Sequence, residues 1–122
     1  MNTQEVFNRN WEVFVVQGYD RARDGESCVY VTENHPGCAI GCCLADELKE
    51  EIVDLGLNKK SISAVIRMFP RVGEYFDTNL GFLIRMQLWH DNRVNGDPES
   101  AASGLRDIAL RYELEVPETD NG

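Results

Sequence analysis

Residues 37–43 read Gly37-Cys38-Ala39-Ile40-Gly41-Cys42-Cys43, a run of small side chains that carries three thiols. Glycine and alanine let two stretches of backbone approach closely, and free cysteine is among the residue types most often buried. We therefore expect this turn to pack tightly against the rest of the protein, with its cysteines filling gaps in the core.

The residues before the turn predict a short β-hairpin. Segment 28–32 reads Cys-Val-Tyr-Val-Thr and is rich in β-branched and aromatic side chains, while 34–37 reads Asn-His-Pro-Gly and has the composition of a tight turn. Segment 38–40 is expected to return and pair with 28–32, in a register that the sequence does not fix. Because an isolated two-stranded hairpin is marginal in water, its apolar face must lie on helices.

Apolar residues at helical spacing predict about five helices around this hairpin. They are expected from Thr3 towards Gly18, Leu44 to Leu55, Asn58 or Ser61 to Pro70, Thr78 or Asn79 to about Asp91, and Asp97 through Tyr112, with an irregular turn over 71–76. The predicted class is α+β, mostly α-helical, with one hairpin packed on the helices. Residues 1–116 form one expected globular domain, and 117–122 are an expected disordered tail.

Composition and charge narrow the classes of partner. Twenty-one acidic and twelve basic residues give a net charge of −9, which repels a phosphate backbone and argues against direct binding to nucleic acid or an anionic membrane. A protein of basic character is the more plausible partner. The sequence has no apolar run of the ~18 residues that a membrane span needs, and its first residues lack the basic and apolar segments of a signal peptide, so we expect neither membrane insertion nor secretion. Its crowded cysteines favour reduced thiols in a cytoplasm.

Zinc binding is one chemical reading of the cysteines, because thiolates and imidazoles suit tetrahedral zinc. The candidate ligands are Cys28, His35, Cys38 and Cys42. Structural zinc sites usually show two separated pairs of Cys or His, whereas these residues fall on one expected hairpin. Buried structural thiols explain them better, so we expect no metal and no other cofactor.

Nucleophilic catalysis is a second reading. Cys38 in the turn, with His90 as base and Asp91 as the residue that orients it, has the composition of a cysteine-dependent site. The sequence does not supply their proximity, and His90 near a helix end is also explained by the helix dipole. A structure with these side chains far apart would remove the hypothesis.

A run of carboxylates on the second expected helix is a candidate binding surface for a basic partner. It comprises Asp46, Glu47, Glu50, Glu51 and Asp54. Ordinary solvation of an exposed helix face explains the same residues.

Several short motifs together resemble a group of small uncharacterised bacterial and bacteriophage proteins that share a Cys-Ala-Ile-Gly core and a late His-Asp. The matching segments are 28–30 (Cys-Val-Tyr), 37–41 (Gly-Cys-Ala-Ile-Gly), 44–48 (Leu-Ala-Asp-Glu-Leu), 82–83 (Phe-Leu) and 87–91 (Gln-Leu-Trp-His-Asp). The resemblance implies a bacterial or bacteriophage origin and implies no particular chemistry.

These observations favour a small acidic interaction or regulatory protein that binds a host macromolecule, most plausibly a protein, over an enzyme. The alternative is a small cysteine-dependent or zinc-binding enzyme that uses Cys38, His90 and Asp91. The oligomeric state is left open by the sequence.

Overall fold

A computed structural model describes residues 1–24 and 27–117, with only the backbone of residues 24, 27 and 28. The described residues form six α-helices, a π-helical turn (η1), a 3-10 turn (η2) and two very short strands. Their bounds are α1 Thr3–Trp11, η1 Glu12–Val16, β1 Arg23–Asp24, β2 Ser27–Cys28, η2 Gly41–Cys43, α2 Asp46–Asp54, α3 Ile62–Met68, α4 Pro70–Tyr75, α5 Leu80–Arg93 and α6 Pro98–Tyr112.

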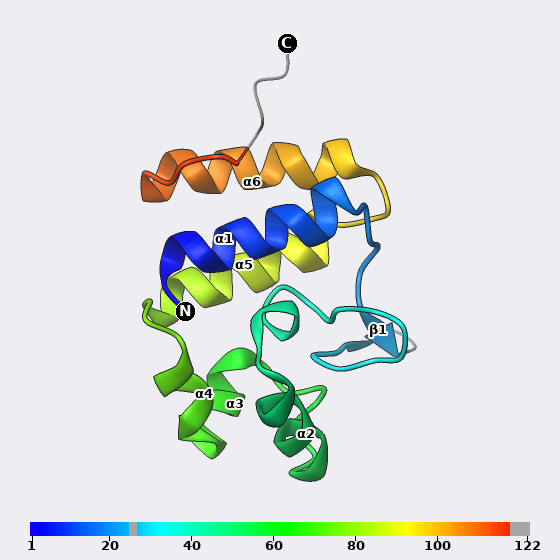
Figure 1. The fold of residues 1–122 in the computed structure, drawn as a ribbon, viewed down its shortest axis with the longest axis vertical. Coiled ribbons are helices and arrows are strands. Elements are labelled where there is room, and N and C mark those ends of the chain that lie inside the picture. Colours follow the sequence, from blue (N-terminus) through cyan, green and yellow to red (C-terminus); the bar gives the residue numbers. More distant parts are fainter. Residues whose placement is uncertain (25–26, 118–122) are drawn as a thin grey trace.

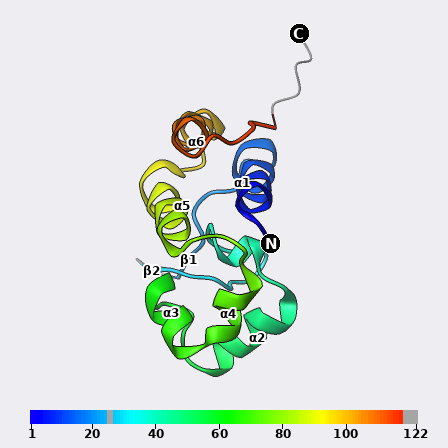
Figure 2. The same ribbon diagram turned by 90° about the vertical axis from the view of Figure 1, so that its left-hand side faces the viewer.

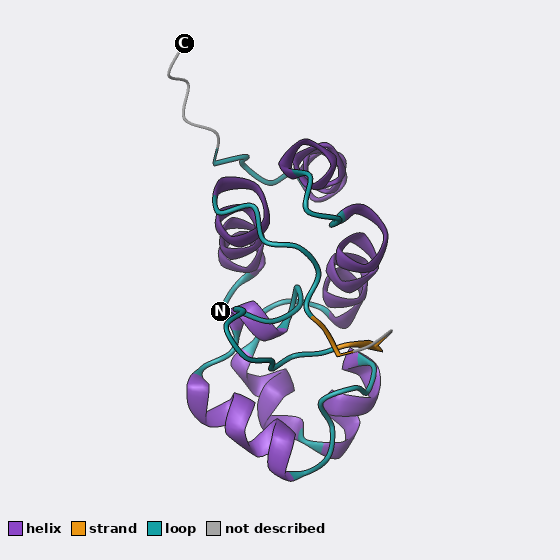
Figure 3. Ribbon diagram, turned by 90° about the vertical axis from the view of Figure 1, so that its right-hand side faces the viewer, coloured by secondary structure: helices purple, strands orange, loops and turns teal. Residues whose placement is uncertain are grey.

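The helices lie in two groups (Figures 1 and 2). Helices α1, α5 and α6 pack side by side in one group, and α2, α3 and α4 form the other. The long loop that contains β1, β2 and η2 runs between the groups, as the loop and strand colours show in Figure 3. A single core cluster joins both groups through that loop, and its fully buried members include Phe14, Ile40 and Met86. No helix in the described part of the chain is long and apolar enough to cross a membrane.

The predicted hairpin is wrong, and with it the α+β class. The described ladder pairs Arg23 with Cys28 and Asp24 with Ser27, so it shares only Cys28 with the predicted hairpin. Between segments 28–32 and 38–40 we find one backbone hydrogen bond, from Cys38 N–H to the Val29 carbonyl at 3.1 Å. The β-branched residues of 28–32 are explained by burial in an irregular loop, because β propensity mostly measures fit to a half-buried surface. The fold is all-helical in class.

Most predicted helices are present, with local corrections at their ends. The first helix begins at Thr3 as expected, and the residue before it, Asn2, caps it in a reciprocal capping box with Glu5. Ser61, Asn79 and Asp97 each accept a backbone N–H at the start of α3, α5 and α6, as expected.

The expected irregular turn over 71–76 is largely a helix, α4. It brings the α-helices among the described residues to six, where about five were expected. Pro70 ends α3 but also begins α4, where its missing N–H costs nothing. The expected tail, 117–122, lies outside the described residues except for Pro117.

The turn over residues 37–43 is as tight as its small residues predict. A methyl group added at Gly41 would lie 2.7 Å from the Tyr30 Cα and would also overlap the Tyr30 carbonyl, which a methyl at Gly37 would meet as well. Cys38, Cys42 and Cys43 are all buried and free. This turn fixes Tyr30 and Cys38 at the boundary between the two groups of helices.

Candidate functional site: a cationic pocket beside Cys38

A pocket of about 610 Å³ opens where the two groups of helices meet. The segment before and after the short strands forms one side, the start of α3 and the residues before it form another, and one face of α5 forms the third. Its described lining residues are Arg21, Arg23, Tyr30, Cys38, Lys59, Lys60, Ser61, Ile62, Ser63, Ile84, Gln87, Leu88 and Asp91. This volume lies within the range of small-molecule sites.

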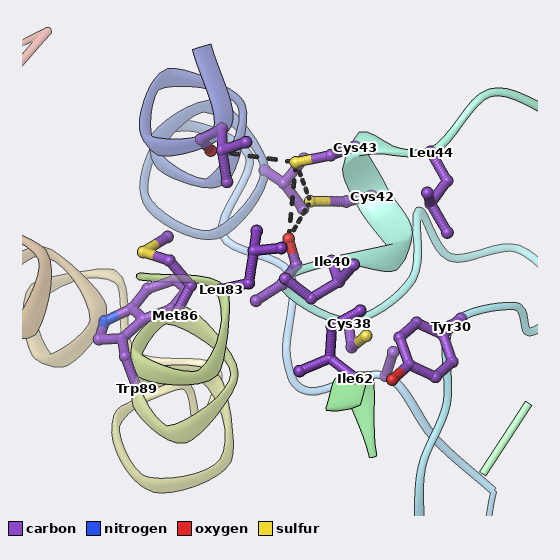
Figure 4. Close-up of a cluster of buried hydrophobic side chains, with 14 of the residues drawn as sticks. Tyr30, Cys38, Ile40, Cys42, Cys43, Leu44, Ile62, Leu83, Met86 and Trp89 are labelled. Atoms are coloured by element: carbon purple, nitrogen blue, oxygen red, sulfur yellow. Dashed lines mark hydrogen bonds between the residues drawn. The ribbon is translucent and has the colours of Figure 1, made fainter. Parts of the chain in front are cut away.

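The buried wall of the pocket is formed by two groups that stay uncharged at neutral pH. The Cys38 Sγ accepts a hydrogen bond from the Gly41 N–H at 3.4 Å, and burial raises the pKa of this thiol to about 12. The Tyr30 hydroxyl donates to the Lys60 carbonyl at 2.8 Å, and burial likewise raises its pKa. Figure 4 shows Cys38 beside Tyr30 and Ile62, apart from Cys42 and Cys43. Cys38 is therefore a thiol here and not an activated thiolate.

His90 is fully buried behind the pocket and does not line it. Its Nε2 accepts the Ala22 N–H at 3.3 Å, so its Nδ1 carries the proton and donates to the Asp91 Oδ1 at 3.2 Å. Burial lowers the pKa of His90, while Asp91 acts in the opposite direction. The ring also packs edge-on to Phe14, with 5.2 Å between ring centroids. The neutral imidazole thus has a structural role with both nitrogens engaged.

The structure brings together two of the three predicted catalytic candidates. Cys38 and Asp91 line the same pocket, but the described side chains include no hydrogen bond between Cys38 and His90. A base that already holds the Ala22 N–H is poorly placed to accept a thiol proton. The Cys38–His90–Asp91 reaction stays a prediction, and this geometry does not add support to it.

The predicted metal ligands are scattered in the described structure. His35 accepts the Gly37 N–H through Nδ1 at 2.9 Å and donates to the Asp20 carbonyl at 2.7 Å, so its ring is occupied. Cys42 contacts the Ala39 carbonyl at 3.5 Å and the Cys43 sulfur at 3.9 Å, on the side of the turn that faces α1. The Cys28 side chain lies outside the described part. Within that part, no three His, Cys, Asp or Glu residues are grouped to hold a metal.

The acidic residues of α2 lie mainly on the surface, as predicted. Glu51 pairs with Arg71 at 3.0 Å, whereas the other four are exposed. A second hollow, of about 510 Å³, lies beside them. It is lined by Val31, Asp46, Lys49, Glu50, Val53 and Asp54.

Sequence reasoning missed the residues that give the first pocket its character. These are the cations Arg21, Arg23, Lys59 and Lys60, together with Gln87. The Arg21 Nε and the Gln87 Oε1 are buried and have no hydrogen-bond partner among the described residues. Nothing in the sequence links positions 21–23 with 59–60, since only the fold brings them to one rim.

Helix α5 also leaves an apolar stripe exposed next to this pocket. Leu80, Ile84 and Leu88 are spaced four residues apart and are 40%, 36% and 50% exposed. Residues at this spacing share one helix face. The apolar residues of α5 occur on more than one helix face, which predicts a largely buried helix, and this exposed face is the exception.

Comparison with known proteins gives no relative from which to transfer a role. No family model matches the chain, and no curated protein or solved structure matches it either. The resemblance to small bacterial and bacteriophage proteins stays a prediction, and function has to be argued from the site itself.

Proposed function

We propose that this chain is a small cytoplasmic interaction protein of bacterial or bacteriophage origin that binds a host protein without catalysing a reaction. The observation that carries the proposal is the exposed stripe of Leu80, Ile84 and Leu88 on α5. Exposed apolar residues that are aligned on one face, rather than scattered, are typical of surfaces that contact another protein. The partner presents apolar side chains to this stripe.

The cysteine chemistry is consistent with a non-catalytic role. Cys38 and Cys42 both have pKa values raised by burial, and among the described residues Cys38 makes no hydrogen bond to a histidine. A thiol-reactive probe near neutral pH is therefore expected to label Cys38, Cys42 and Cys43 slowly in the folded protein and rapidly after unfolding. A Cys28→Ser background restricts the readout to these three thiols. Rapid labelling of Cys38 in the folded protein would instead favour the cysteine-dependent enzyme.

The test of the binding surface is affinity capture from bacterial lysate with matched variants. The double variant Leu80→Gln/Leu88→Gln keeps helix propensity while removing apolar surface. Leu110→Gln on α6 is the control, since Leu110 is 81% exposed and far from the stripe in sequence. We expect a protein captured by the native chain and by the control to be lost with the double variant. Equal capture by all three would contradict the proposal.

The acidic face of α2 is the alternative surface, for a basic partner. Asp46, Glu50 and Asp54 are exposed beside the second hollow. If this face makes the contact, their joint replacement by Asn, Gln and Asn would abolish capture of the partner. Added salt would also strongly weaken capture by the native chain. Loss of capture in these acidic variants, with retention in the Leu80→Gln/Leu88→Gln variant, would assign the function to α2 instead.

A further inference from the structure

The pocket beside Cys38 gathers cations in a chain that is otherwise acidic. Four of the twelve basic residues line it, whereas Asp91 is the one carboxylate among its described lining residues. Since Cys38 and Tyr30 stay neutral, the described side chains give the pocket a net positive charge. A concave site with one sign of charge focuses its electrostatic field and attracts ions of the opposite sign.

The four cations come from two separate parts of the chain, and a hydrogen bond holds the side chain of Arg21 in place. Arg21 lies just before β1 and Arg23 is its first residue, while Lys59 and Lys60 precede α3. The Arg21 Nη1 donates to the Asp91 carbonyl at 2.9 Å, which fixes one edge of its guanidinium. A guanidinium held this way presents its other N–H groups in a set direction, as recognition of a planar or tetrahedral oxyanion requires.

Two buried polar atoms of the lining residues have no hydrogen-bond partner in the part of the chain that the structure describes. The Arg21 Nε is a donor and the Gln87 Oε1 is an acceptor, while the Gln87 Nε2 donates to the Asp91 Oδ1 at 3.1 Å. Buried polar atoms in folded proteins almost always have a hydrogen-bond partner, so each of these two calls for one. A ligand that satisfies both offers an anionic acceptor and a hydroxyl or N–H donor.

Part of the remaining wall is apolar, beside Ser61 and Ser63. Ile62 is buried at the start of α3, and Ile84 and Leu88 face the pocket from α5. The volume of about 610 Å³ exceeds what an inorganic phosphate needs. A ligand with an organic portion beside its anionic group therefore matches the lining better than a simple ion does.

We propose that this pocket binds a small organic phosphate, with its phosphate among Arg21, Arg23, Lys59 and Lys60 and its hydroxyl-bearing portion against Gln87 and the apolar wall. Phosphate matches the surplus of cations better than a single carboxylate does, since it carries nearly two negative charges at neutral pH. The pocket shares Ile84 and Leu88 with the α5 stripe, but phosphate binding does not depend on a protein partner, so purified protein suffices to test it.

The test is a titration followed by amide chemical shifts, with ribose 5-phosphate, inorganic pyrophosphate and unphosphorylated ribose as probes at about physiological ionic strength. Ribose 5-phosphate is expected to cause saturable shifts at residues 21–23, 59–63 and 84–91, and ribose alone is expected to cause none. The variant Arg23→Gln/Lys60→Gln is expected to weaken this binding by about tenfold or more, because each lost charged hydrogen bond removes a large share of the affinity.

Three further variants make the result specific. Arg23→Lys/Lys60→Arg keeps the charges and is expected to retain binding. Arg67→Gln removes one positive charge from α3 outside the pocket lining and is expected to change nothing. Gln87→Met removes the unpaired acceptor. It is expected to weaken the binding of ribose 5-phosphate more than that of pyrophosphate, because pyrophosphate has no sugar hydroxyl to donate to this acceptor.

Several outcomes would overturn the proposal. One is the absence of saturable shifts with either phosphate probe, and another is equal binding by the native chain and the Arg23→Gln/Lys60→Gln variant when both give the dispersed spectrum of a folded protein. Saturable binding of an oligoglutamate peptide without any response to phosphates would assign the pocket to an acidic protein segment.

Discussion

The turn over residues 37–43 and the cationic pocket meet at Tyr30 and Cys38, yet they are built in opposite ways. In the turn, polar groups are buried and paired: the Asn10 Nδ2 donates to the carbonyls of Val6 and Ala39 at 2.9 and 3.0 Å. In the pocket, charges of one sign gather and two buried polar atoms have no described partner. The difference favours a structural role for the buried cysteines and supports the proposal that the arginines and lysines bind a ligand.

The largest effect expected on the turn side is that of Gly41→Ala. Its new methyl would meet the Tyr30 backbone, with the Cα at 2.7 Å, and backbone cannot rotate away as a side chain can. We expect a loss of about 3 kcal/mol in unfolding free energy, or failure to fold, as for severe overpacking. Urea denaturation followed by circular dichroism measures it.

Gly56→Ala is the matched control for Gly41→Ala. Gly56 has a φ of +70° but nothing within 4 Å of an added methyl, so only the left-handed backbone is penalised, by about 1 kcal/mol. If the two variants lose equal stability, close packing is not what makes Gly41 necessary.

The second effect concerns the polar group at the centre of the turn. Asn10→Ala removes a fully buried amide that holds the Val6 and Ala39 carbonyls, with an expected cost of about 2 kcal/mol. Asn8→Ala, on the exposed side of α1, is the control and is expected to change stability by less than about 0.5 kcal/mol. A cost for Asn10→Ala no greater than that for Asn8→Ala would mean that water replaces the amide without penalty.

The helices were predictable because their signals are local. Capping residues such as Ser61, Asn79 and Asp97 lie within one turn of the N–H groups they satisfy, so the sequence alone carries the information. The hairpin was not predictable from Val29 and Val31, because β-branched residues suit any half-buried extended segment, paired or not. Whether such a segment finds a strand partner depends on tertiary contacts.

The candidate site was predictable only in part. Cys38 and Asp91 drew attention as reactive types, and both do line the pocket. The positive charge of the pocket depends on residues such as Arg21 and Lys60. These two lie far apart along the chain and belong to no recognisable sequence motif. Identifying Gln87 required knowing that its Oε1 is buried without a partner, which is a property of packing and not of sequence.

A third effect, of intermediate size, is the pH dependence that buried His90 gives to the unfolding free energy. Burial lowers its pKa below the ordinary value of 6.5, so below that pH the unfolded chain binds a proton that the folded chain does not. Unfolding free energy is therefore expected to fall as pH drops below about 6.5, by up to about 1.4 kcal/mol per unit of pKa difference. Denaturation at about pH 7.5 and at about pH 5.5 measures this dependence.

His90→Gln is the control for that dependence. It removes the titrating ring, so the difference in stability between the two pH values should shrink even if the variant is less stable at both. All other ionisable groups are the same in both proteins, so their contributions cancel in the comparison. An unchanged pH dependence would show that His90 takes up its proton equally well in the folded chain.

The smallest expected effect on unfolding free energy is that of replacing cations in the pocket. It is the most direct test of whether the turn and the pocket have different roles. Arg23→Gln and Lys60→Gln remove exposed cations that face others of the same sign, so each is expected to change stability by less than about 0.5 kcal/mol. The loss of like-charge repulsion even favours a small gain in stability. Denaturation of each variant beside Gly41→Ala measures the difference. A large loss on replacing either cation would mean that the pocket charges hold the fold together, and the division between a structural turn and a binding pocket would not stand.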